Sequence, residues 1–389
     1  MQLLGGLTAQ QFLQEYWQKK PLLIRQAIPG FISPLSAEEL AGFACEEDVE
    51  SRLIFEHAGE TPWALMTGPF EETQFTALPD SHWTLLVQKA NQFIPELAEF
   101  LQSFDFIPGW RIDDIMISYA PEHGSVGPHL DQYDVFLLQG MGQRRWQINT
   151  DDFSQSELVA DTPLKILKNF TSTQEWILEP GDMLYLPPNI AHYGVALNDC
   201  MTYSIGFRAP SVAELLTSFV DDYVTSLFDD ERYTDKDLCI QQHSGEITDI
   251  TLNKVKDILL KNLEQPEQIK RWFGKFVTES PQSDAIYSDN DIDTAEFSEL
   301  LNTYKVFYRS EFSRFAYSET EQSILLFIDG EEITVSRDLL LLVQQICDNR
   351  VIQLDSIKQV LGIPQALDLL TDLYNRSSIW LDTIDTEND

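Results

Sequence analysis

The sequence predicts a β-rich α+β protein, in which a barrel of short strands precedes a helical region and a mixed C-terminal domain. Short β-branched and alternating runs recur over 114–207 with Pro- and Gly-containing turns between them, which is typical of an all-β barrel or sandwich. Apolar residues then recur at helical spacing over 211–277. After a polar, acidic stretch, residues 295–389 mix helical and strand patterns.

The strand predictions depend on alternation and on turn residues. Asp114–Ala120 alternates, is rich in β-branched residues and leads into a Gly-containing loop. A Pro180-Gly181-Asp182 turn separates two later strands, because Pro and Gly suit positions that need a fixed or a positive φ. The expected strands are 114–120, 134–140, 144–148, 176–179, 183–186 and 201–207.

The later elements follow from capping and spacing. Ser211 with Glu214 three residues on is a capping-box pattern that opens a first helix, and Pro266 suits the first turn of a third. The first helix is apolar over more than one stripe, so we expect it to pack on two partners. In the C-terminal domain, Asp329-Gly330 between two apolar runs predicts a hairpin.

Inside the strand-rich region, His129, Asp131 and His192 form an H-x-D … H arrangement, the ligand set of non-haem Fe(II) oxygenases. His129 and Asp131 are two residues apart, so on a strand both side chains project from the same face. His192 must then come from another strand that faces them across the barrel. Three ligands leave three positions open on octahedral iron, enough for a bidentate cosubstrate and dioxygen. The tripeptide alone is a weak signal, and its surroundings strengthen it.

These surroundings resemble a known family, the bacterial ribosomal-protein oxygenases, which have a JmjC-type cupin fold, a double-stranded β-helix. The similar segments are GPHLDQYDVF at 127–136, RRW at 144–146 and PGD … LPP … H between 180 and 192. The resemblance begins near residue 17 and covers most of the chain. Ordinary cupins usually place a second His where this chain has Asp131, so the carboxylate favours iron and 2-oxoglutarate chemistry.

Four regions are expected: the resemblance implies the oxygenase, dimerisation and winged-helix-like regions, whereas the polar, acidic composition and Pro281 predict the linker. They are a JmjC/cupin oxygenase domain with an N-terminal helical and strand elaboration at 1–210, a helical dimerisation region at 211–278, an acidic linker at 279–294 and a winged-helix-like domain at 295–389. We therefore expect a homodimer. The alternative is that the helices form a cap on the barrel of the same subunit.

Composition limits the possible partners. The chain carries 26 Lys and Arg against 63 Asp and Glu, a formal net charge of −37. Such a charge argues against direct nucleic-acid binding, which needs basic patches, and favours a basic polypeptide. Adaptation to a saline habitat or plain solubility is the alternative. Although winged helices often bind DNA, residues 291–389 hold seven Lys and Arg against nineteen Asp and Glu, so we expect no DNA binding there.

Targeting signals are not evident in the sequence. The N-terminal residues lack a basic region and a long apolar stretch, and no run approaches transmembrane length. The four cysteines lie far apart and form no C-x-x-C pair, which is typical of reduced thiols. We expect a cytoplasmic protein that does not enter a membrane.

The cosubstrate residues are assigned partly by position. Arg144 lies on the strand after the ligands, and its planar fork matches the distal carboxylate of 2-oxoglutarate. Arg145 should point out of the barrel by strand alternation. Ser118 is a candidate hydroxyl partner for the same carboxylate. The resemblance also implies Arg144 and Ser118 for this role.

Substrate contacts are expected where the barrel opens. Asp114 and Met116 alternate with Ser118 along one strand, so all three should face inward, with Asp114 at the mouth. A carboxylate there can pair with the guanidinium of a peptide arginine, and Tyr133 could pack along its aliphatic part. Ser204 could add a hydrogen bond. The resemblance supports these four as substrate contacts, although core packing is the alternative for Met116 and Tyr133. We expect His123 to be exposed and not to bind the metal.

The resemblance implies an Fe(II)- and 2-oxoglutarate-dependent protein hydroxylase that uses O2 and acts on the β-carbon of an arginine (3-hydroxylation) in bacterial large-subunit ribosomal protein sixteen. One alternative is a histidyl hydroxylase of a ribosomal protein, which Asp114 disfavours because it pairs best with a permanent cation. Another is a non-catalytic metal-binding cupin adaptor, which the triad together with Arg144 disfavours. Lysine demethylation is less expected, because the sequence shows no aromatic cage or reader module.

Overall fold

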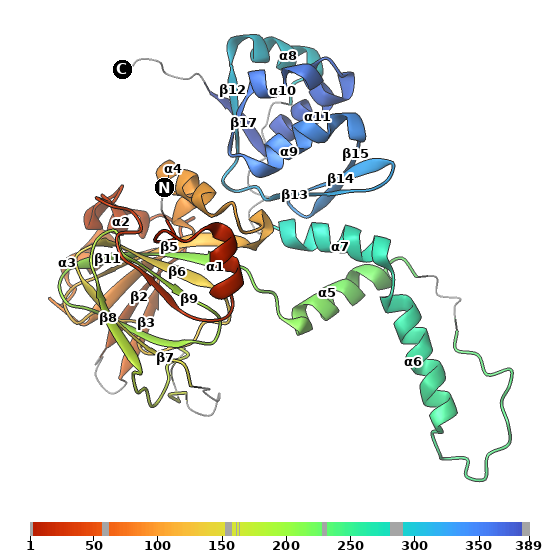
Figure 1. Cartoon of the computed structure of the whole chain (residues 1–389), viewed down its shortest axis with the longest axis horizontal. Helices are drawn as coiled ribbons and strands as arrows, with labels where there is room; N and C mark the ends of the chain where they lie inside the picture. The colour runs from red at the N-terminus through yellow and green to blue at the C-terminus, as the bar shows by residue number, and fades with distance from the viewer. Residues whose placement is uncertain are drawn as a thin grey trace. The chain divides into compact units, whose positions relative to one another are not determined.

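A computed structural model describes residues 3–56, 62–151, 158–160, 162, 164–227, 232–280 and 291–382. The chain divides into two compact units, Met1–Ala209 and Pro210–Asp389 (Figure 1). Residues 281–290 of the expected acidic linker lie outside the described residues. Within the described ranges, no helix is long and apolar enough to cross a membrane.

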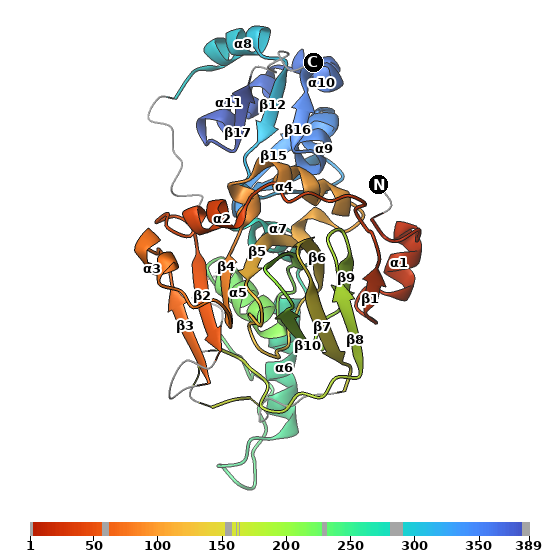
Figure 2. The same ribbon diagram turned by 90° about the vertical axis from the view of Figure 1, so that its left-hand side faces the viewer.

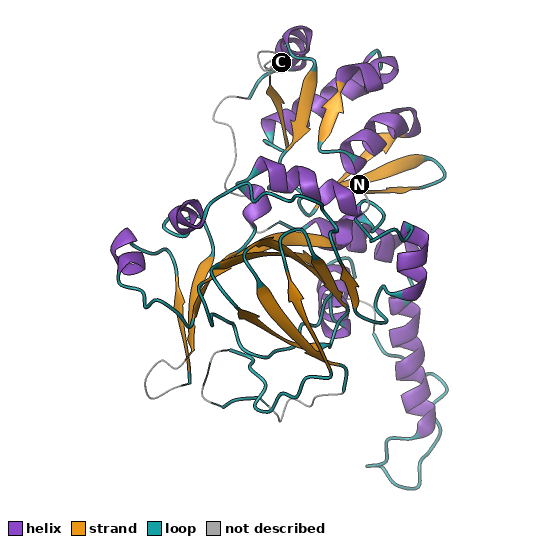
Figure 3. Cartoon of the chain, turned by 60° about the vertical axis from the view of Figure 1, so that its left-hand side comes forward, coloured by secondary structure: helices purple, strands orange, loops and turns teal. Residues whose placement is uncertain are grey.

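The first unit contains an eight-stranded antiparallel sheet in the order β1-β9-β6-β11-β5-β4-β2-β3 and a second sheet in the order β10-β7-β8 (Figures 2 and 3). The larger sheet is formed by β1 (Leu22–Ile24), β2 (Ser51–Glu56), β3 (Trp63–Thr67), β4 (Trp83–Val87), β5 (Ile112–Ala120), β6 (Val135–Met141), β9 (Met183–Leu186) and β11 (Cys200–Phe207). The smaller one is formed by β7 (Arg144–Asn149), β8 (Gln174–Leu178) and β10 (Ala191–Ala196).

The six predicted strands correspond to β5, β6, β7, β8, β9 and β11, with ends that differ by one or two residues. Side chains from both sheets pack together between them. Val135 and Leu137 of β6 and Leu184 of β9 share one core cluster with Trp146 and Ile148 of β7. The two sheets therefore enclose the interior of the predicted barrel.

The opposite face of the larger sheet packs on the N-terminal helices. Alternation along β6 turns Phe136 outward, where its ring lies 5.5 Å from Phe12 of α1 and 4.8 Å from Tyr185 of β9. Leu40 and Leu97 belong to the same core. The helices are α1 (Ala9–Glu15), α2 (Ala37–Phe43), α3 (Glu72–Thr76) and α4 (Pro95–Leu101).

The predicted turn at Gly181 is present, and Gly181 adopts a φ of +87°. A Cβ at this position would lie 2.3 Å from the carbonyl oxygen of Ile28, so only glycine fits. Asp182 accepts hydrogen bonds from the backbone N–H groups of Gln26 and Glu179 and from Arg25. Burial raises the pKa of Asp182, but these donors outweigh it and lower the pKa below its usual value.

A buried carboxylate fixes the start of β6. Asp134 is fully buried, and it accepts hydrogen bonds from Gln18 Nε2 at 2.9 Å, Arg111 Nη2 at 3.1 Å and the Tyr185 hydroxyl at 2.6 Å. The three donors come from the N-terminal segment, the turn before β5 and β9. Asp134 thus joins segments that are far apart in the sequence.

Replacing Asp134 with Ala should lower the free energy of unfolding of this unit by about 3–5 kcal/mol, because it leaves the Arg111 guanidinium without its carboxylate. Urea unfolding followed by tryptophan fluorescence measures the change. Asp113→Ala is the matched control, because that carboxylate is exposed on β5. If the two variants unfolded at the same urea concentration, Asp134 would not have the stabilising role described here.

The second unit begins with three helices, α5 (Val212–Val224), α6 (Asp249–Leu263) and α7 (Pro266–Thr278). The predicted capping box is confirmed, since Ser211 Oγ accepts from Glu214 N at 3.1 Å and the Glu214 carboxylate accepts from Ser211 N at 2.6 Å. Pro266 stands in the first turn of α7, as expected. The aromatic ring of Phe219 on α5 packs on Trp272 of α7, with 5.2 Å between centroids.

The remaining elements form two three-stranded sheets and four helices within residues 291–382. They are α8 (Thr294–Thr303), β12 (Val306–Arg309), β13 (Phe315–Glu319), β14 (Ser323–Ile328), β15 (Glu331–Ser336), α9 (Leu340–Asp348), β16 (Val351–Gln353), α10 (Leu354–Leu361), α11 (Pro364–Asn375) and β17 (Ile379–Asp382). The predicted hairpin is β14–β15, and both Asp329 and Gly330 have the positive φ of its tight turn. α7 packs closely on this sheet, since a Cβ at Gly274 would lie 2.3 Å from the Phe327 ring.

Candidate active site

The three predicted metal ligands converge. His129 and His192 form an isolated antiparallel bridge, with N–H to carbonyl distances of 3.0 Å in both directions. The ligand atoms of His129, Asp131 and His192 lie within 4.8 Å of one another. Asp131 follows the bridge in a loop, so the expectation that both residues of the H-x-D pair lie on a regular strand was wrong. A single bridge position and the loop that follows it nevertheless direct both side chains to one site. His192 comes from another strand, β10, as expected, but it pairs directly beside His129, with 4.2 Å between the ring centroids, and does not face it across the barrel.

Both histidines are held in the tautomer that a metal requires. His129 Nδ1 lies 2.9 Å from the carbonyl oxygen of Gly127, and His192 Nδ1 lies 2.9 Å from that of Ile190. A carbonyl can only accept, so Nδ1 carries the proton and Nε2 is left for the metal. Burial and the neighbouring His129 lower the pKa of His192 to about 4, so His192 is neutral near pH 7, as a ligand must be.

A buried arginine lies on the interior face of β7. Arg144 is only 2% exposed, and among the described residues its Nε and Nη2 atoms have no hydrogen-bond partner. Its guanidinium lies over the Trp146 ring at 5.8 Å, and that ring lies 5.9 Å from His192. Buried N–H groups without an acceptor are costly, so this guanidinium is suited to an anionic ligand. Arg145, on the opposite face of β7, is less buried, in agreement with strand alternation.

Ser118 lies on the interior face of β5. It is 5% exposed, faces Thr202 across the β5–β11 pair, and its hydroxyl lies 3.4 Å from the Thr202 carbonyl oxygen. Thr202 in turn donates to Gln139 Oε1 at 3.2 Å. Buried hydroxyl and amide groups therefore interrupt the apolar interior at this point.

Asp114 and Met116, two of the four predicted substrate residues, lie on β5, whereas Ser204 lies on the neighbouring strand β11 and Tyr133 in the loop before β6. Ser204 is the cross-strand neighbour of Met116, and Met116 packs beside Ile54 and Leu86. Asp114 accepts a hydrogen bond from the backbone N–H of Lys89 at 2.9 Å.

Tyr133 lies beside both carboxylates of the site. It is 43% exposed, and it lies close enough to Asp131 and Asp114 for both carboxylates to act on its hydroxyl group. Burial, followed by the negative charges of Asp131 and Asp114, raises the pKa of Tyr133. Tyr133 therefore connects the metal site with the expected position of the substrate. His123, in contrast, is exposed and lies against His82, with 5.0 Å between ring centroids, as expected for a residue outside the metal site.

Sequence reasoning missed several residues of this region. Trp146 could have been found, because it is two residues after Arg144 on the same strand and therefore shares its face. Gln88 and Arg52 gave no signal, since they reach the region around Asp114 only through the pairing of β4 with β5 and with β2. Asp134 lay inside the recognised motif, but its burial depends on partners from distant segments.

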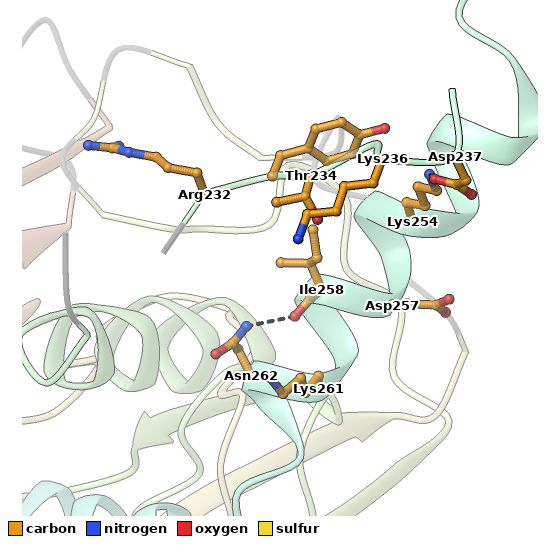
Figure 4. Close-up of a pocket in the computed structure, with 10 residues that line it drawn as sticks. Arg232, Thr234, Lys236, Asp237, Lys254, Asp257, Ile258, Lys261 and Asn262 are labelled. Carbon is orange, nitrogen blue, oxygen red and sulfur yellow. Dashed lines mark hydrogen bonds and ion pairs between the residues drawn. The ribbon is translucent and has the colours of Figure 1, made fainter. Parts of the chain in front are cut away.

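Another cavity lies in the second unit. The segment 232–237 and α6 line a space of about 720 Å³, and Lys236, Lys254 and Lys261 are among its residues (Figure 4). Lys254 is ion-paired with Asp237. Among the described residues, His129, Asp131 and His192 are the only group of three that could hold a metal.

Known protein families and relatives match both the barrel that carries the metal site and the C-terminal domain. A model of the JmjC domain matches residues 99–215, and a model of the ROXA-like winged helix matches residues 261–379. The ribosomal protein uL16 3-hydroxylase of Escherichia coli is 39% identical over 269 residues, which cover 69% of this chain and 71% of that protein. A probable ribosomal oxygenase of Haemophilus influenzae is 33% identical over 334 residues, which cover 84% of this chain and 82% of its own length.

Solved structures of a ribosomal oxygenase match the fold of this chain over nearly its whole length. The ribosomal oxygenase YcfD of Escherichia coli, in complex with cobalt and 2-oxoglutarate, matches with a TM-score of 0.85 and 32% identity, and the match covers 97% of this chain and 99% of that one. An X-ray structure of the same protein gives a TM-score of 0.87 with the same coverage. The matching winged-helix model includes α7, which packs on β13–β15. With its JmjC domain, its winged helix and its converging His-Asp-His triad, the chain belongs to the ribosomal oxygenase family.

Proposed function

We propose that this protein is an Fe(II)- and 2-oxoglutarate-dependent hydroxylase that modifies the β-carbon of an arginine in ribosomal protein uL16. The observation that carries the proposal is the combination of the triad with the buried Arg144 guanidinium, whose Nε and Nη2 lack partners among the described residues. The uL16 3-hydroxylase activity named for the relative, and the cobalt and 2-oxoglutarate bound by YcfD, support it.

The residues fit the cofactor and the cosubstrate. His129, Asp131 and His192 would hold iron, and Arg144 with Ser118 would hold the distal carboxylate of 2-oxoglutarate. When bound, iron and 2-oxoglutarate supply, with dioxygen, the oxidising power that inserts a hydroxyl group into a C–H bond. The apolar side chains of β6, β7 and β9 that pack together in the barrel would limit the access of water to this reaction.

Asp114 would determine which side chain is modified. Its carboxylate lies at the start of β5, four residues before Ser118 on the same face, so a guanidinium bound there holds the far end of an arginine away from the metal. Tyr133 would pack along the aliphatic part of that side chain, with Met116 and Ser204 beside it. A histidine is shorter and is mostly neutral near pH 7, so Asp114 favours arginine over the histidyl alternative.

Mass spectrometry of uL16 tests the proposal. Incubation of the iron-loaded protein with 2-oxoglutarate and an arginine-containing uL16 peptide should add the mass of one oxygen to that arginine. Omission of 2-oxoglutarate is the control and should leave the peptide unchanged. If 2-oxoglutarate binds but no uL16 peptide is modified, the protein is an adaptor or acts on another substrate.

We further propose that α5 and α6 form a homodimer interface. One face of α5 packs on α7, where Lys275 pairs with Asp222 and Trp272 donates to Ser218. The rest of α5 and one side of α6 carry apolar side chains that are between 41% and 72% exposed. They are Val212, Leu216, Val220 and Val224 on α5, with Leu252, Val255, Ile258, Leu259 and Leu260 on α6. Apolar surface of this extent favours a second copy as its partner.

Light scattering should give twice the 44.6 kDa mass of one chain at micromolar concentration. Leu259→Asp should shift the protein to monomer, because it places a charge in the apolar stripe. Asn253→Asp adds the same charge at an exposed polar position of α6 and should keep the dimer. A monomeric wild-type protein would contradict the interface.

The proposed partner is a basic ribosomal protein in the cytoplasm. The net charge of −37 would attract such a polypeptide and repel nucleic acid. In the C-terminal domain, Arg337, Arg350 and Arg376 are ion-paired with glutamates, and Arg309 donates to the last carbonyls of α9. These guanidinium groups are engaged within the fold, which supports a protein-contact role for this winged helix over a DNA-binding one.

A further inference from the structure

The side chain of Gln88 connects Asp114 with a cation on another strand. Gln88 follows β4 directly, and its backbone N–H donates to the Glu50 carbonyl oxygen at 2.9 Å. One terminal atom of its amide lies 3.2 Å from Asp114 Oδ2, and the other lies 2.5 Å from Arg52 Nη2. The amide also contacts Met116 Sδ at 3.3 Å.

Only one orientation of this amide is chemically consistent. A carboxylate oxygen accepts and a guanidinium nitrogen donates, so the Gln88 nitrogen faces Asp114 and its oxygen faces Arg52. Arg52 thus fixes the direction in which Gln88 donates. Arg52 Nη2 also lies 3.4 Å from the Glu50 carboxylate, which anchors the guanidinium.

Asp114 Oδ2 therefore accepts two N–H groups, one from Gln88 and one from the backbone of Lys89 at 2.9 Å. Two donors on one oxygen restrain rotation of the carboxylate plane. Oδ1 is directed toward β11, since a Cβ placed on Gly206 would lie 3.5 Å from it. The carboxylate is thus presented in a fixed direction along the strand pair that carries Met116 and Ser204.

We propose that Gln88, oriented by Arg52, is a positioning residue that aims the Asp114 carboxylate at the guanidinium of the substrate. The inference rests on the proposed function. The Gln88 side chain suits this role because its amide is uncharged. A cation bonded directly to Asp114 would neutralise the carboxylate and compete with the substrate arginine, whereas an amide orients the carboxylate and leaves its charge intact.

Gln88→Glu tests the positioning role of Gln88 in the full-length, iron-loaded protein with an arginine-containing uL16 peptide. The substitution keeps the size of the side chain but turns a carboxylate oxygen toward Asp114 in place of the N–H donor. We expect KM for the peptide to rise roughly tenfold, because a charge-assisted hydrogen bond is replaced by a repulsive contact. The dissociation constant of 2-oxoglutarate, measured in parallel, should change by less than the peptide KM.

Gln147→Glu is the matched control. Gln147 Nε2 donates to the Glu175 carboxylate at 2.7 Å on the outer face of the smaller sheet, so the same substitution creates the same repulsion away from the site. The peptide KM of this variant should equal that of the wild type. In the Asp114→Ala background, Gln88→Glu should add no further loss, because the residue acts through Asp114.

Three results would overturn the inference. One is an unchanged peptide KM in Gln88→Glu, and another is an equal loss in the presence and absence of Asp114. The third is a loss of stability in both Gln88→Glu and the isosteric apolar variant Gln88→Met without a selective effect on peptide KM, which would show a structural role. If the wild-type protein hydroxylates no arginine peptide, the proposed function itself is wrong, and that result is known before any variant is compared.

Discussion

Replacing His129 or Asp131 with Ala should abolish 2-oxoglutarate turnover and leave the barrel folded. Each substitution removes one of three ligands whose donor atoms lie within 4.8 Å of one another. Loss of one ligand would weaken metal binding severely, and the oxidation chemistry that iron would supply there would be lost with it. The barrel should persist, because its core is formed by apolar contacts between the two sheets and involves no metal.

Succinate formation and metal content measure this prediction, and circular dichroism checks the fold. His123→Ala is the control, since that histidine is exposed and lies against His82. It should keep wild-type turnover. If His129→Ala or Asp131→Ala also kept wild-type turnover, the assigned triad could not be the metal site.

The second large effect concerns selectivity. Asp114→Ala should weaken peptide hydroxylation by about 2–5 kcal/mol in kcat/KM, because a desolvated charge pair with the substrate guanidinium is lost. Uncoupled 2-oxoglutarate turnover should suffer far less, since Asp114 is not a metal ligand. Asp113→Ala removes the same charge from the other face of β5 and should have little effect on either reaction.

A double-mutant cycle identifies the partner of Asp114. Replacing the target arginine of the peptide with lysine should be nearly as damaging as Asp114→Ala, because an ammonium cannot reproduce the bidentate fork. Combined, the two changes should be strongly non-additive, as expected of groups in contact. Additive losses in kcat/KM would show that Asp114 does not contact the target side chain.

The parts of the fold that the sequence predicted depend on local signals. β5, β6, β7, β9 and β11 carry alternating or β-branched runs bounded by Gly and Pro, so their periodicity is sufficient. β10 carries His192 but lies outside the six strands that the pattern predicts, because AHYGVA contains little alternation. The metal ligands were nevertheless recognisable, since their residue types and spacing are set by the chemistry of iron.

The parts that could not be predicted depend on contacts between distant segments. β1, β2, β3 and β4 complete the larger sheet, but nothing in their sequence specifies that β4 pairs with β5 or β1 with β9. The approach of Gln88 to Asp114 is a consequence of that pairing. Similarly, α7 contains an ordinary amphipathic pattern, and only the close approach of Gly274 to Phe327 reveals that it packs on the β13–β15 sheet.

The loop that carries Asp131 is fixed at both of its ends. On one side His129 is bonded to His192 by two backbone hydrogen bonds, and on the other Asp134 holds the donors Gln18, Arg111 and Tyr185. Within this short loop, the Asp131 carbonyl oxygen also accepts from Asn189 N at 2.7 Å. A metal ion would therefore meet a ligand set that is already in place. Repeated removal and return of iron should then require no refolding of the chain around the three ligands.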